Sequence, residues 1–314
     1  MTDLNVWFDV EDSGEVHVVR DVSFSLGRGE RIGLVGESGC GKTTALLALM
    51  GLMPPNATIA GRVILDGADL LVGGEETVAP HRWRSVSMIF QGAMNAFSPV
   101  HRIGAQIVEP MEFHGTCRGN AARSRAKELL ELVGIPATRF SSFPHELSGG
   151  QRQRASIAMA LACEPKLLLA DEPTTALDVI VQAQVLDLIA RLSDQLGLAV
   201  ILVTHDLPLV SGLCHRTAVM YAGQIAEMGE AATIVHDPRH PYTRLLFAAT
   251  PDIDGEGTIA SIPGTPPRLD QAFTGCAFAP RCDVVIERCS SLVPVLARSG
   301  AGHAVRCIRP GVRP

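Results

Sequence analysis

The chain has few aromatic residues, no long apolar runs and no excess of basic charge. Aromatic side chains make up 4% of its 314 residues, so a core has to be built mainly from Leu, Val, Ile and Ala. No apolar run approaches the roughly 20 residues that cross a bilayer, and the acidic start MTDLNVWFDVED lacks the pattern of a secretion signal. A formal net charge of -6 gives no reason to expect a nucleic-acid-binding surface. We therefore expect a cytosolic protein that serves a membrane only by docking onto another subunit.

Short apolar runs alternate with helical spacing along the chain, which predicts an α/β layered fold. Residues 166–170 (KLLLA) and 198–204 (LAVILVT) are typical of strands buried on both faces, as in parallel sheets covered by helices. Residues 178–196 have helical spacing and end at Gly197, a favourable C-terminal cap. Residues from about 92 to 160 lack strand signals and predict a mostly helical insertion. Beyond about residue 250 a Pro-rich stretch and four cysteines predict a small appendage.

Residues 36–43 read GESGCGKT and fit the pattern G-x-x-x-x-G-K-[ST], after a strand and before a helix. Glycines let the backbone wrap around phosphates, and the helix N-terminus adds positive partial charge. We predict that Lys42 reaches the β- and γ-phosphates of a nucleotide and that Thr43 binds Mg²⁺. The alternative is a glycine turn with an exposed lysine. The predicted nucleotide contacts of this segment are Gly36, Glu37, Ser38, Gly39, Cys40, Gly41, Lys42, Thr43 and Thr44.

Two adjacent carboxylates, Asp171 and Glu172, follow the buried strand KLLLA. Ligands of open α/β folds bind at the carboxyl ends of the strands, so both side chains are expected at that edge. We predict that Asp171 holds Mg²⁺ and that Glu172 acts as the general base on the attacking water. The alternative is an acidic pair at a strand end that faces solvent.

Residues 147–154 read LSGGQRQR, and here the sequence resembles the ABC ATPase family, whose signature is LSGGQ. Ser148 is a natural N-cap, and Gly149 and Gly150 permit close approach to the helix that starts at Gln151. The resemblance implies that these four residues cover the γ-phosphate held by a partner's phosphate loop, so that two chains close head to tail around two nucleotides.

Three further residues match elements of the same family in order. Gln91 in MIFQ corresponds to the Q-loop glutamine, Asp178 to the D-loop aspartate and His205 in LVTHD to the switch histidine. The resemblance thus implies the catalytic set Glu172, His205, Lys42 and Gln91, and Mg²⁺ ligands Thr43, Gln91 and Asp171. Many members stack adenine on an aromatic side chain upstream of the phosphate loop. Residues 13–18 contain none, so Val16 or His17 is left for that role.

The resemblance also implies a fold. It is a P-loop NTPase core of the ABC type with a mainly parallel sheet, an N-terminal antiparallel β subdomain and a helical subdomain at about 92–160. The predicted domains are the ATPase at residues 1–250 and the appendage at 251–314.

Residues 240–246 read HPYTRLL, and Ile262-Pro263-Gly264 and a Cys-bearing tail follow. These resemble the dipeptide, oligopeptide and nickel importer branch. The implied function is an ATP-hydrolysing subunit that powers peptide uptake, with nickel or short oligosaccharides as alternative substrates and a soluble non-transport ATPase as a further alternative. The implied partners are two transmembrane permease subunits, a second ATPase chain, different or identical, and indirectly an extracytoplasmic substrate-binding protein. No nucleic acid partner is expected, and the implied location is peripheral, on the cytoplasmic face of the membrane.

The tail cysteines Cys276, Cys282, Cys289 and Cys307 read C-x5-C-x6-C-x17-C, which is not the CxxC pairing of common zinc sites. Resemblance to tails in the importer branch implies a 4Fe–4S cluster, which takes four cysteine ligands. Zinc and four free thiols are the alternatives.

Overall fold

The computed structural model describes residues 1–11, 14–92, 96–249, 261–300 and 302–313. Its contacts divide the chain into two compact units. Unit 1 comprises Met1–Ser25, Ile32–Val72 and Thr204–Pro314, and unit 2 comprises Leu26–Arg31 and Gly73–Val203. The predicted domain boundary at residue 250 falls outside the described residues, and it stays a prediction. The described part of the appendage belongs to unit 1, together with the predicted phosphate loop.

Unit 1 contains two larger groups of strands and one short hairpin. The first is an antiparallel sheet in the order β2-β1-β4, formed by β1 (Thr2–Val10), β2 (Gly14–Val22) and β4 (Ala57–Arg62). In the second group β10 (Arg216–Tyr221) pairs parallel with β3 (Arg31–Val35) and antiparallel with β11 (Gln224–Glu230). Two short tail strands, β13 (Ala304–Val305) and β12 (Ala297–Arg298), continue it antiparallel. β5 (Ile64–Leu65) and β6 (Ala68–Asp69) form a separate hairpin. The N-terminal antiparallel subdomain is confirmed.

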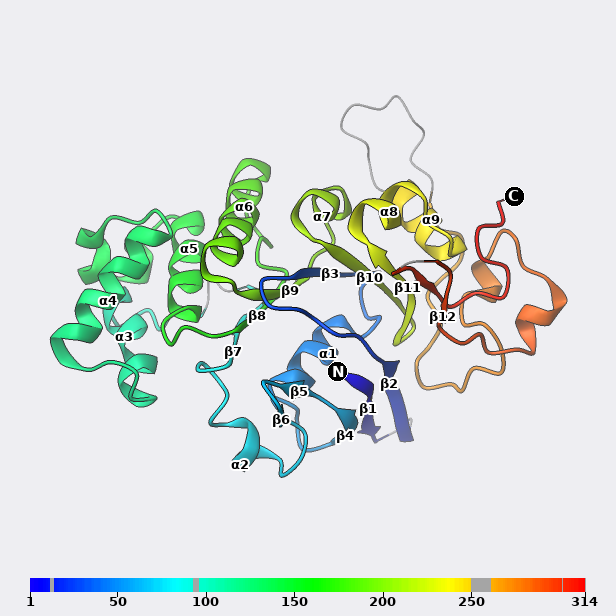
Figure 1. Cartoon of the computed structure of the whole chain (residues 1–314), viewed down its shortest axis with the longest axis horizontal. Coiled ribbons are helices and arrows are strands. Elements are labelled where there is room, and N and C mark those ends of the chain that lie inside the picture. Colours follow the sequence, from blue (N-terminus) through cyan, green and yellow to red (C-terminus); the bar gives the residue numbers. More distant parts are fainter. Residues whose placement is uncertain (12–13, 93–95, 250–260, 301, 314) are drawn as a thin grey trace. The chain divides into compact units, whose positions relative to one another are not determined.

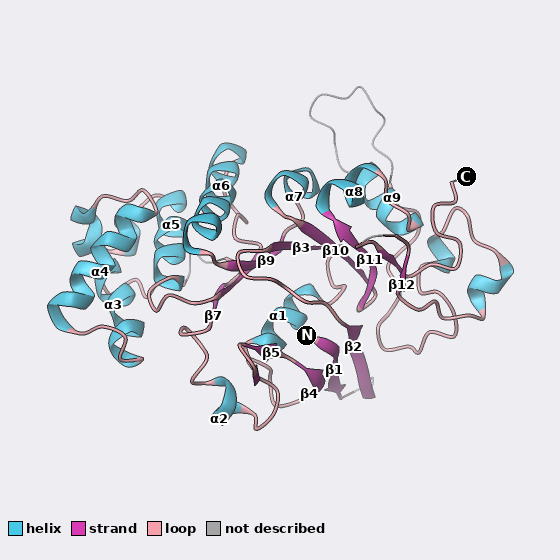
Figure 2. Ribbon diagram, viewed as in Figure 1, coloured by secondary structure: helices cyan, strands magenta, loops and turns pink. Residues whose placement is uncertain are grey.

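The helices of unit 1 cover its strands. They are α1 (Lys42–Leu49), α7 (Leu207–Leu213), α8 (Ala231–His236) and α9 (Pro241–Ala248), with the 3₁₀ turns Ala279–Arg281 and Glu287–Ser290 in the tail. Figure 2 shows α7, α8 and α9 along one face of β10 and β11, with α1 on the other side, where it contacts β1 and β2. The phosphate loop thus leads from the end of β3 directly into α1.

Unit 2 contains a parallel sheet and a helical part. The strands are β7 (Val86–Ile89), β8 (Leu167–Asp171) and β9 (Ala199–Val203), paired parallel with β8 in the middle. The helices are α2 (Glu75–Val78), α3 (Ile103–Phe113), α4 (Gly119–Leu132), α5 (Gly149–Ala160) and α6 (Val179–Leu196), with the 3₁₀ turns Ala137–Ser141 and Pro144–Glu146. Helices α3, α4 and α5 contact one another and form the helical part (Figure 1). The described residues between 96 and 160 contain no strand, so the predicted helical insertion is confirmed.

The parallel strands form because their sequences have no polar face to turn toward water. Every residue of β8 and of β9 is buried, as the continuous apolar runs predicted. Helix α6 starts at the N-cap Asp178, whose Oδ1 accepts the Val181 amide at 2.9 Å, and it ends at Gly197 in the left-handed conformation with φ 62°. These buried strands hold the chain rigidly up to their carboxyl ends, where the candidate site residues follow.

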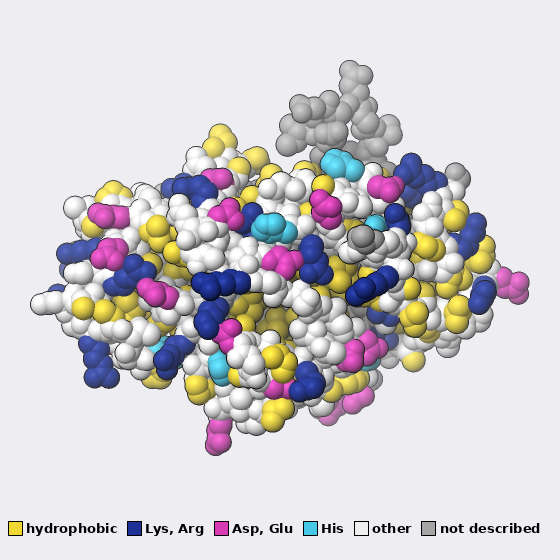
Figure 3. All heavy atoms as spheres, viewed as in Figure 1, with side chains coloured by type: hydrophobic (Ala, Val, Ile, Leu, Met, Phe, Trp, Pro, Cys, Tyr) yellow, Lys and Arg dark blue, Asp and Glu magenta, His cyan; other side chains and the backbone are white. Residues whose placement is uncertain are grey.

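The surface carries both signs of charge side by side on the face shown in Figure 3. Among the described residues, no helix combines the length and the apolar character that crossing a membrane requires.

Candidate functional site

The loop of residues 36–43, called the phosphate loop below, has a backbone shape that only glycine permits at two positions. Gly36 has φ 148°, and a Cβ on it would lie 2.2 Å from the carbonyl oxygen of Met220. Gly41 has φ 103°, and a Cβ there would lie 2.9 Å from the carbonyl oxygen of Val18. These two residues therefore fix the ends of the loop against the neighbouring strands.

Lys42 is the first residue of α1, and its side chain turns back over the loop. Its Nζ donates to the carbonyl oxygens of Gly36 at 2.8 Å and Glu37 at 2.9 Å, and its side chain is buried. The N-cap residue of α1 is Gly41, so no side chain caps this helix. Ser38, Gly39 and Thr43 are exposed. A buried ammonium group, the N-terminus of a helix and an exposed glycine turn are the combination that binds phosphate oxygens.

The acidic pair lies at the carboxyl end of β8, as predicted. Asp171 is 2% exposed, whereas the next residue, Glu172, has φ 45°, an uncommon conformation for a non-glycine residue. The Glu172 Oε2 accepts a hydrogen bond from the Gln91 Nε2 at 2.8 Å and from the Thr175 Oγ1 at 3.1 Å. Residues held in such strained conformations cluster at active sites. Within unit 2 the structure therefore brings together two predicted catalytic residues that are 81 positions apart in the sequence.

The LSGGQ segment begins α5 with a complete capping box. The Ser148 Oγ accepts from the Gln151 amide at 3.3 Å, and the Gln151 Oε1 accepts from the Ser148 amide at 3.0 Å. The predicted N-cap is confirmed. A Cβ on Gly150 would lie 2.7 Å from the Val181 Cγ1, so this glycine is required by the packing of α5 against α6. Ser148 caps the helix next to Gly149.

Two other predicted residues lie at the ends of helices or strands. Asp178 caps α6 through its carboxylate, so part of its role is to start that helix. His205 belongs to unit 1 and is exposed, two residues along the chain from the last residue of β9. The Asp206 amide after it donates to the Thr204 Oγ1 at 3.0 Å. The phosphate loop and His205 thus belong to unit 1, whereas Gln91, Asp171 and Glu172 belong to unit 2.

The residue that packs on adenine was left open between Val16 and His17. The structure gives His17 a partner already, because its ring stacks on Trp7 with centroids 4.5 Å apart and an interplanar angle of 17°. Its Nε2 lies 2.9 Å from the Asn5 Oδ1. Burial, followed by the charge of Arg20, lowers the pKa of His17, which favours a neutral ring. Trp7 in β1 is thus an aromatic residue upstream of the phosphate loop that lies outside residues 13–18.

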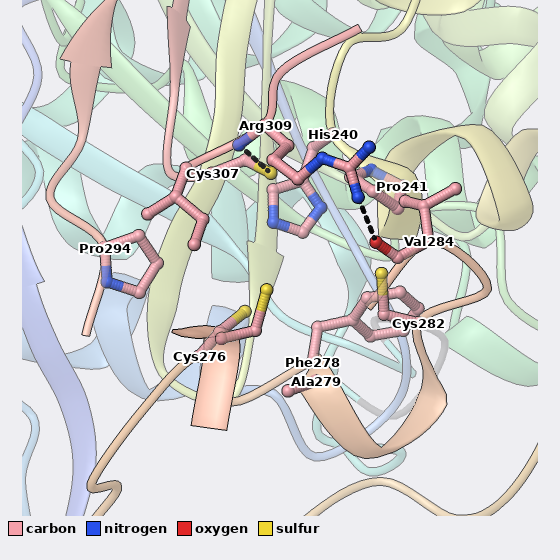
Figure 4. Close-up of a pocket in the computed structure, with 12 residues that line it drawn as sticks. His240, Pro241, Cys276, Phe278, Ala279, Cys282, Val284, Pro294, Cys307 and Arg309 are labelled. Atoms are coloured by element: carbon pink, nitrogen blue, oxygen red, sulfur yellow. Dashed lines mark hydrogen bonds between the residues drawn. The ribbon is translucent and has the colours of Figure 1, made fainter. Parts of the chain in front are cut away.

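The four tail cysteines line one cavity, together with His240, Phe278 and Arg309. Figure 4 shows the sulfur atoms of Cys276, Cys282 and Cys307 directed toward it from different turns of the tail. Burial, and to a smaller extent the neighbouring thiols Cys307, Cys289 and Cys282, raise the pKa of Cys276 to about 11. The sequence pattern therefore correctly marked four cysteines that meet in space.

No single-ion site accompanies this cavity. In the ranges that the structure describes, no group of three or more His, Cys, Asp or Glu side chains is placed to hold a metal ion. Zinc needs its ligands around one ion at roughly 2.0–2.3 Å, so this geometry does not favour the zinc alternative. The expectation of a bound metal is not supported by this geometry, and an iron–sulfur cluster remains a proposal.

Comparison with known proteins gives two family matches. Residues 19–175 match the family model described as ABC transporter, and residues 226–289 match the one described as oligopeptide/dipeptide transporter, C-terminal region. The second match includes the HPYTRLL segment and three of the four tail cysteines, whereas Cys307 lies beyond it.

Curated relatives are similar over nearly the whole chain. The probable peptide ABC transporter ATP-binding protein y4tR of Sinorhizobium fredii is 45% identical over 305 residues, which cover 94% of this chain and 91% of that protein. The oligopeptide transport ATP-binding protein OppD of Escherichia coli is 43% identical over 311 residues, or 98% of this chain and 92% of OppD.

Among solved structures, the dimeric post-hydrolysis state of the ATP-binding cassette MJ0796, bound to ADP and Pi, is similar with a TM-score of 0.65. It is 26% identical and covers 73% of this chain and 97% of that one. The predicted cassette fold is thereby confirmed. The chain belongs to the ABC transporter family, in the branch with the oligopeptide/dipeptide transporter C-terminal region, and it is an ATP-hydrolysing subunit.

Proposed function

We propose that this chain hydrolyses ATP to drive the import of peptides, as a peripheral subunit on the cytoplasmic face of a membrane. Two findings support the substrate class: residues 226–289 match the peptide-transporter C-terminal region, and the relatives named above carry peptide or oligopeptide transport in their names. No described residue favours nickel or a short oligosaccharide, and those substrates become outcomes of the test.

The contact of Gln91 with Glu172 is the observation that carries the catalytic assignment. The Gln91 amide, at 2.8 Å, and the Thr175 hydroxyl, at 3.1 Å, both donate to the same carboxylate oxygen, which holds the carboxylate in one orientation. A general base needs that orientation because it has to take a proton from one particular water molecule.

The phosphate loop supplies the positive charge for the triphosphate. The Lys42 ammonium group donates to neutral carbonyl oxygens of the loop. A charged phosphate oxygen in place of one of them would give a stronger, charge-assisted hydrogen bond. Mg²⁺, when bound, neutralises charge that builds up between the β- and γ-phosphates. The Thr43 hydroxyl, the Gln91 amide oxygen and the Asp171 carboxylate are hard oxygen donors that suit it. His205 is assigned to the γ-phosphate.

A second chain completes the site in this proposal. The capped N-terminus of α5, with Ser148, Gly149, Gly150 and Gln151, covers a nucleotide held by the partner's phosphate loop, and Asp178 lies at the same interface. The partner is a second ATPase chain, and both a different and an identical chain satisfy this arrangement. Two permease subunits and, indirectly, an extracytoplasmic substrate-binding protein complete the transporter.

Substitution of the base tests the proposed function. We expect Glu172→Gln to lower the ATP turnover of the complete transporter by about 10²–10⁴-fold, the contribution of a general base, without loss of ATP binding. The matched control is Glu164→Gln, because Glu164 is an exposed carboxylate of the same unit with a similar backbone conformation, φ 55°. Unchanged turnover in the Glu172→Gln transporter would show that the base is elsewhere.

Transport assays test the substrate class. Proteoliposomes that hold the complete transporter and its binding protein should accumulate labelled di- or oligopeptides when ATP is present on the side of this subunit. Accumulation of Ni²⁺ or of a short oligosaccharide instead would reject peptides as the substrate.

The proposal includes a 4Fe–4S cluster at Cys276, Cys282, Cys289 and Cys307. The donor set fits, because four thiols from separate turns line one cavity, and such a cluster takes one cysteine at each of four irons. When bound, the cluster would cross-link the turns of the tail.

Chemical analysis tests the cluster. Anaerobically purified full-length chain should be brown and should contain iron and acid-labile sulfide in equal amounts, and Cys276→Ser should lose both. The matched control is Cys117→Ser, whose thiol lies outside the cavity. Colourless wild-type protein with stoichiometric zinc would contradict the cluster.

A further inference from the structure

The second residue of the phosphate loop, Glu37, is anchored to the C-terminal part of the chain. Its carboxylate forms a bidentate ion pair with Arg281, in which the Nη1 lies 2.7 Å from Oε2 and the Nη2 lies 2.9 Å from Oε1. Bidentate pairs of this kind are among the stronger and more directional polar contacts in proteins. The side chain of Arg281 is 4% exposed and that of Glu37 is 22% exposed, so solvent weakens the pair only in part.

The main chain of Glu37 is anchored as well. Its amide donates to the phenol oxygen of Tyr242 at 2.9 Å, and Tyr242 itself is completely buried. Tyr242 belongs to α9 and to the HPYTRLL segment. Glu37 is therefore held at its side chain by the appendage and at its backbone by α9, and we call Arg281 and Tyr242 together the Glu37 clamp.

The Glu37 clamp is itself fixed by a rigid environment. The Arg281 Nε donates to the Pro263 carbonyl oxygen at 2.7 Å, and its Nη1 also donates to the Tyr221 hydroxyl at 3.3 Å. The rings of Tyr221 and Tyr242 lie 4.5 Å apart, and Phe278 packs against both, at 5.2 and 5.4 Å. Glu37 raises the pKa of Arg281, and burial raises the pKa of Tyr242, so the first stays charged and the second stays neutral.

The clamp is linked to Lys42, the predicted phosphate-binding lysine, through the backbone of Glu37. The carbonyl oxygen of Glu37 accepts a hydrogen bond from the Lys42 Nζ at 2.9 Å. Movement of Glu37 would therefore move the residue that is assigned to the β- and γ-phosphates. Ser38 and Gly39, which follow Glu37, are exposed, so the clamp holds the loop at the residue just before its solvent-facing part.

The tail contacts the strand beside the phosphate loop at a second place. The Arg20 Nη2 donates to the carbonyl oxygens of Leu269 at 2.9 Å and Gln271 at 3.3 Å, and the guanidinium lies over the Phe273 ring at 4.4 Å. Two residues before Arg20, Val18 has its carbonyl oxygen against Gly41 of the loop. The appendage thus supports the phosphate loop in two ways. It holds Glu37 near the start of the loop, and it contacts β2, the strand that packs against Gly41 near the end of the loop.

We propose that Arg281 and Tyr242 are positioning residues for the phosphate loop, and that the C-terminal appendage thereby sets the affinity of this chain for nucleotide. The inference rests on the proposed role of residues 36–43 as the phosphate site. A loop that is held in its binding shape loses less conformational freedom when the nucleotide binds. The clamp touches no reacting atom, and bound phosphates would hold Lys42 in place by themselves, so the clamp raises affinity for ATP and ADP alike and leaves the chemical step of the bound nucleotide unchanged.

Nucleotide titrations of the full-length chain test the proposal. We expect Arg281→Gln to weaken binding of both MgADP and MgATP by about tenfold, because the loop would be ordered only on binding. In the complete transporter the KM for ATP should rise by the same factor, with kcat at saturating ATP within about twofold of wild type. Arg281→Lys keeps the positive charge but cannot form the bidentate pair, so its nucleotide affinity should lie between those of wild type and Arg281→Gln. The matched control is Arg288→Gln, an exposed arginine that precedes Cys289 as Arg281 precedes Cys282.

Two further variants separate positioning from loss of folding. Tyr242→Phe removes one hydroxyl and should weaken binding of both nucleotides, although the ring stays in place. Glu37→Gln leaves the appendage intact, and the double variant Glu37→Gln/Arg281→Gln should bind nucleotide no more weakly than Arg281→Gln alone, because both changes break the same contact. Thermal unfolding of each variant gives the accompanying change in stability.

The outcomes distinguish this inference from the proposed function. A wild-type chain that retains no nucleotide would overturn both. If wild type binds nucleotide and Arg281→Gln binds it with the same affinity, the clamp alone is overturned. The same holds if the losses of affinity in Glu37→Gln and Arg281→Gln simply add in the double variant. A lower kcat with unchanged KM would also contradict it, because that pattern belongs to a residue acting on the chemical step.

Discussion

Glu227 is a buried carboxylate on which three donors from the C-terminal part of the chain converge. It lies in β11 and is completely buried. Its Oε1 accepts from the Arg239 amide and from the His303 Nε2, both at 2.7 Å, and its Oε2 accepts from the His240 amide at 3.0 Å. These bonds join β11 to the turn before α9 and to the appendage. Glu227 therefore fixes the segment that carries Tyr242.

We expect Glu227→Ala to destabilise this region by about 3–5 kcal/mol, because a buried donor left without a partner costs roughly 1–3 kcal/mol and water can enter only in part. Glu227→Gln should cost about 1–3 kcal/mol, since its amide nitrogen would face at least one of the donors. Glu230→Ala is the matched control. That exposed carboxylate ends the same strand, and its loss should change stability by less than about 0.5 kcal/mol.

Hydrogen exchange is the appropriate assay, because a chain of two units need not unfold in one step. Protection of the Arg239 and His240 amides should fall in Glu227→Ala in proportion to the lost free energy, while amides of β8 in the other unit should keep theirs. Equal protection of these two amides in wild type and variant would show that Glu227 does not hold this turn.

Two further predictions follow from glycine positions. Gly36→Ala should abolish nucleotide binding by the full-length chain in a titration with MgADP, because its Cβ would lie 2.2 Å from a backbone oxygen, whereas Gly14→Ala, with nothing within 4 Å, should bind as wild type. Gly150→Val should lower ATP turnover of the complete transporter yet leave nucleotide affinity of the isolated chain unchanged, because this glycine spaces α5 from Val181 and α5 is assigned to the partner's nucleotide. Gly150→Val with wild-type turnover would contradict that assignment.

Much of the fold is predictable from local pattern. The runs KLLLA and LAVILVT became β8 and β9 because a strand covered on both faces has no polar side. Helix α6 began and ended where Asp178 and Gly197 predicted. Such signals lie within a few residues of the helix or strand that they define, so they can be identified from a single sequence.

Other elements could not be predicted, because their partners are far away in the chain. The tail strands β12 and β13 have two residues each and exist only by pairing with β11. Short strands of this kind obtain their stability from the neighbour, so their own composition does not identify them.

The candidate site shows the same division. The phosphate loop and the LSGGQ helix are continuous segments, so their glycine and capping patterns are sufficient to identify them in the sequence. The bond between Gln91 and Glu172 and the pair of Glu37 with Arg281 join residues 81 and 244 positions apart. Glu37 occupies a position of the motif that tolerates any residue, so nothing in the pattern indicated that it has a partner.

A single-turnover experiment on the complete transporter tests whether Glu172 is the base that cleaves bound ATP. Transporter with Glu172→Gln is loaded with radiolabelled ATP and Mg²⁺, freed of excess nucleotide, and analysed over time for retained ATP and released phosphate. We expect the variant to keep intact ATP while wild type releases phosphate and ADP. Phosphate release by the variant at the wild-type rate, or failure of both proteins to retain nucleotide, would contradict it.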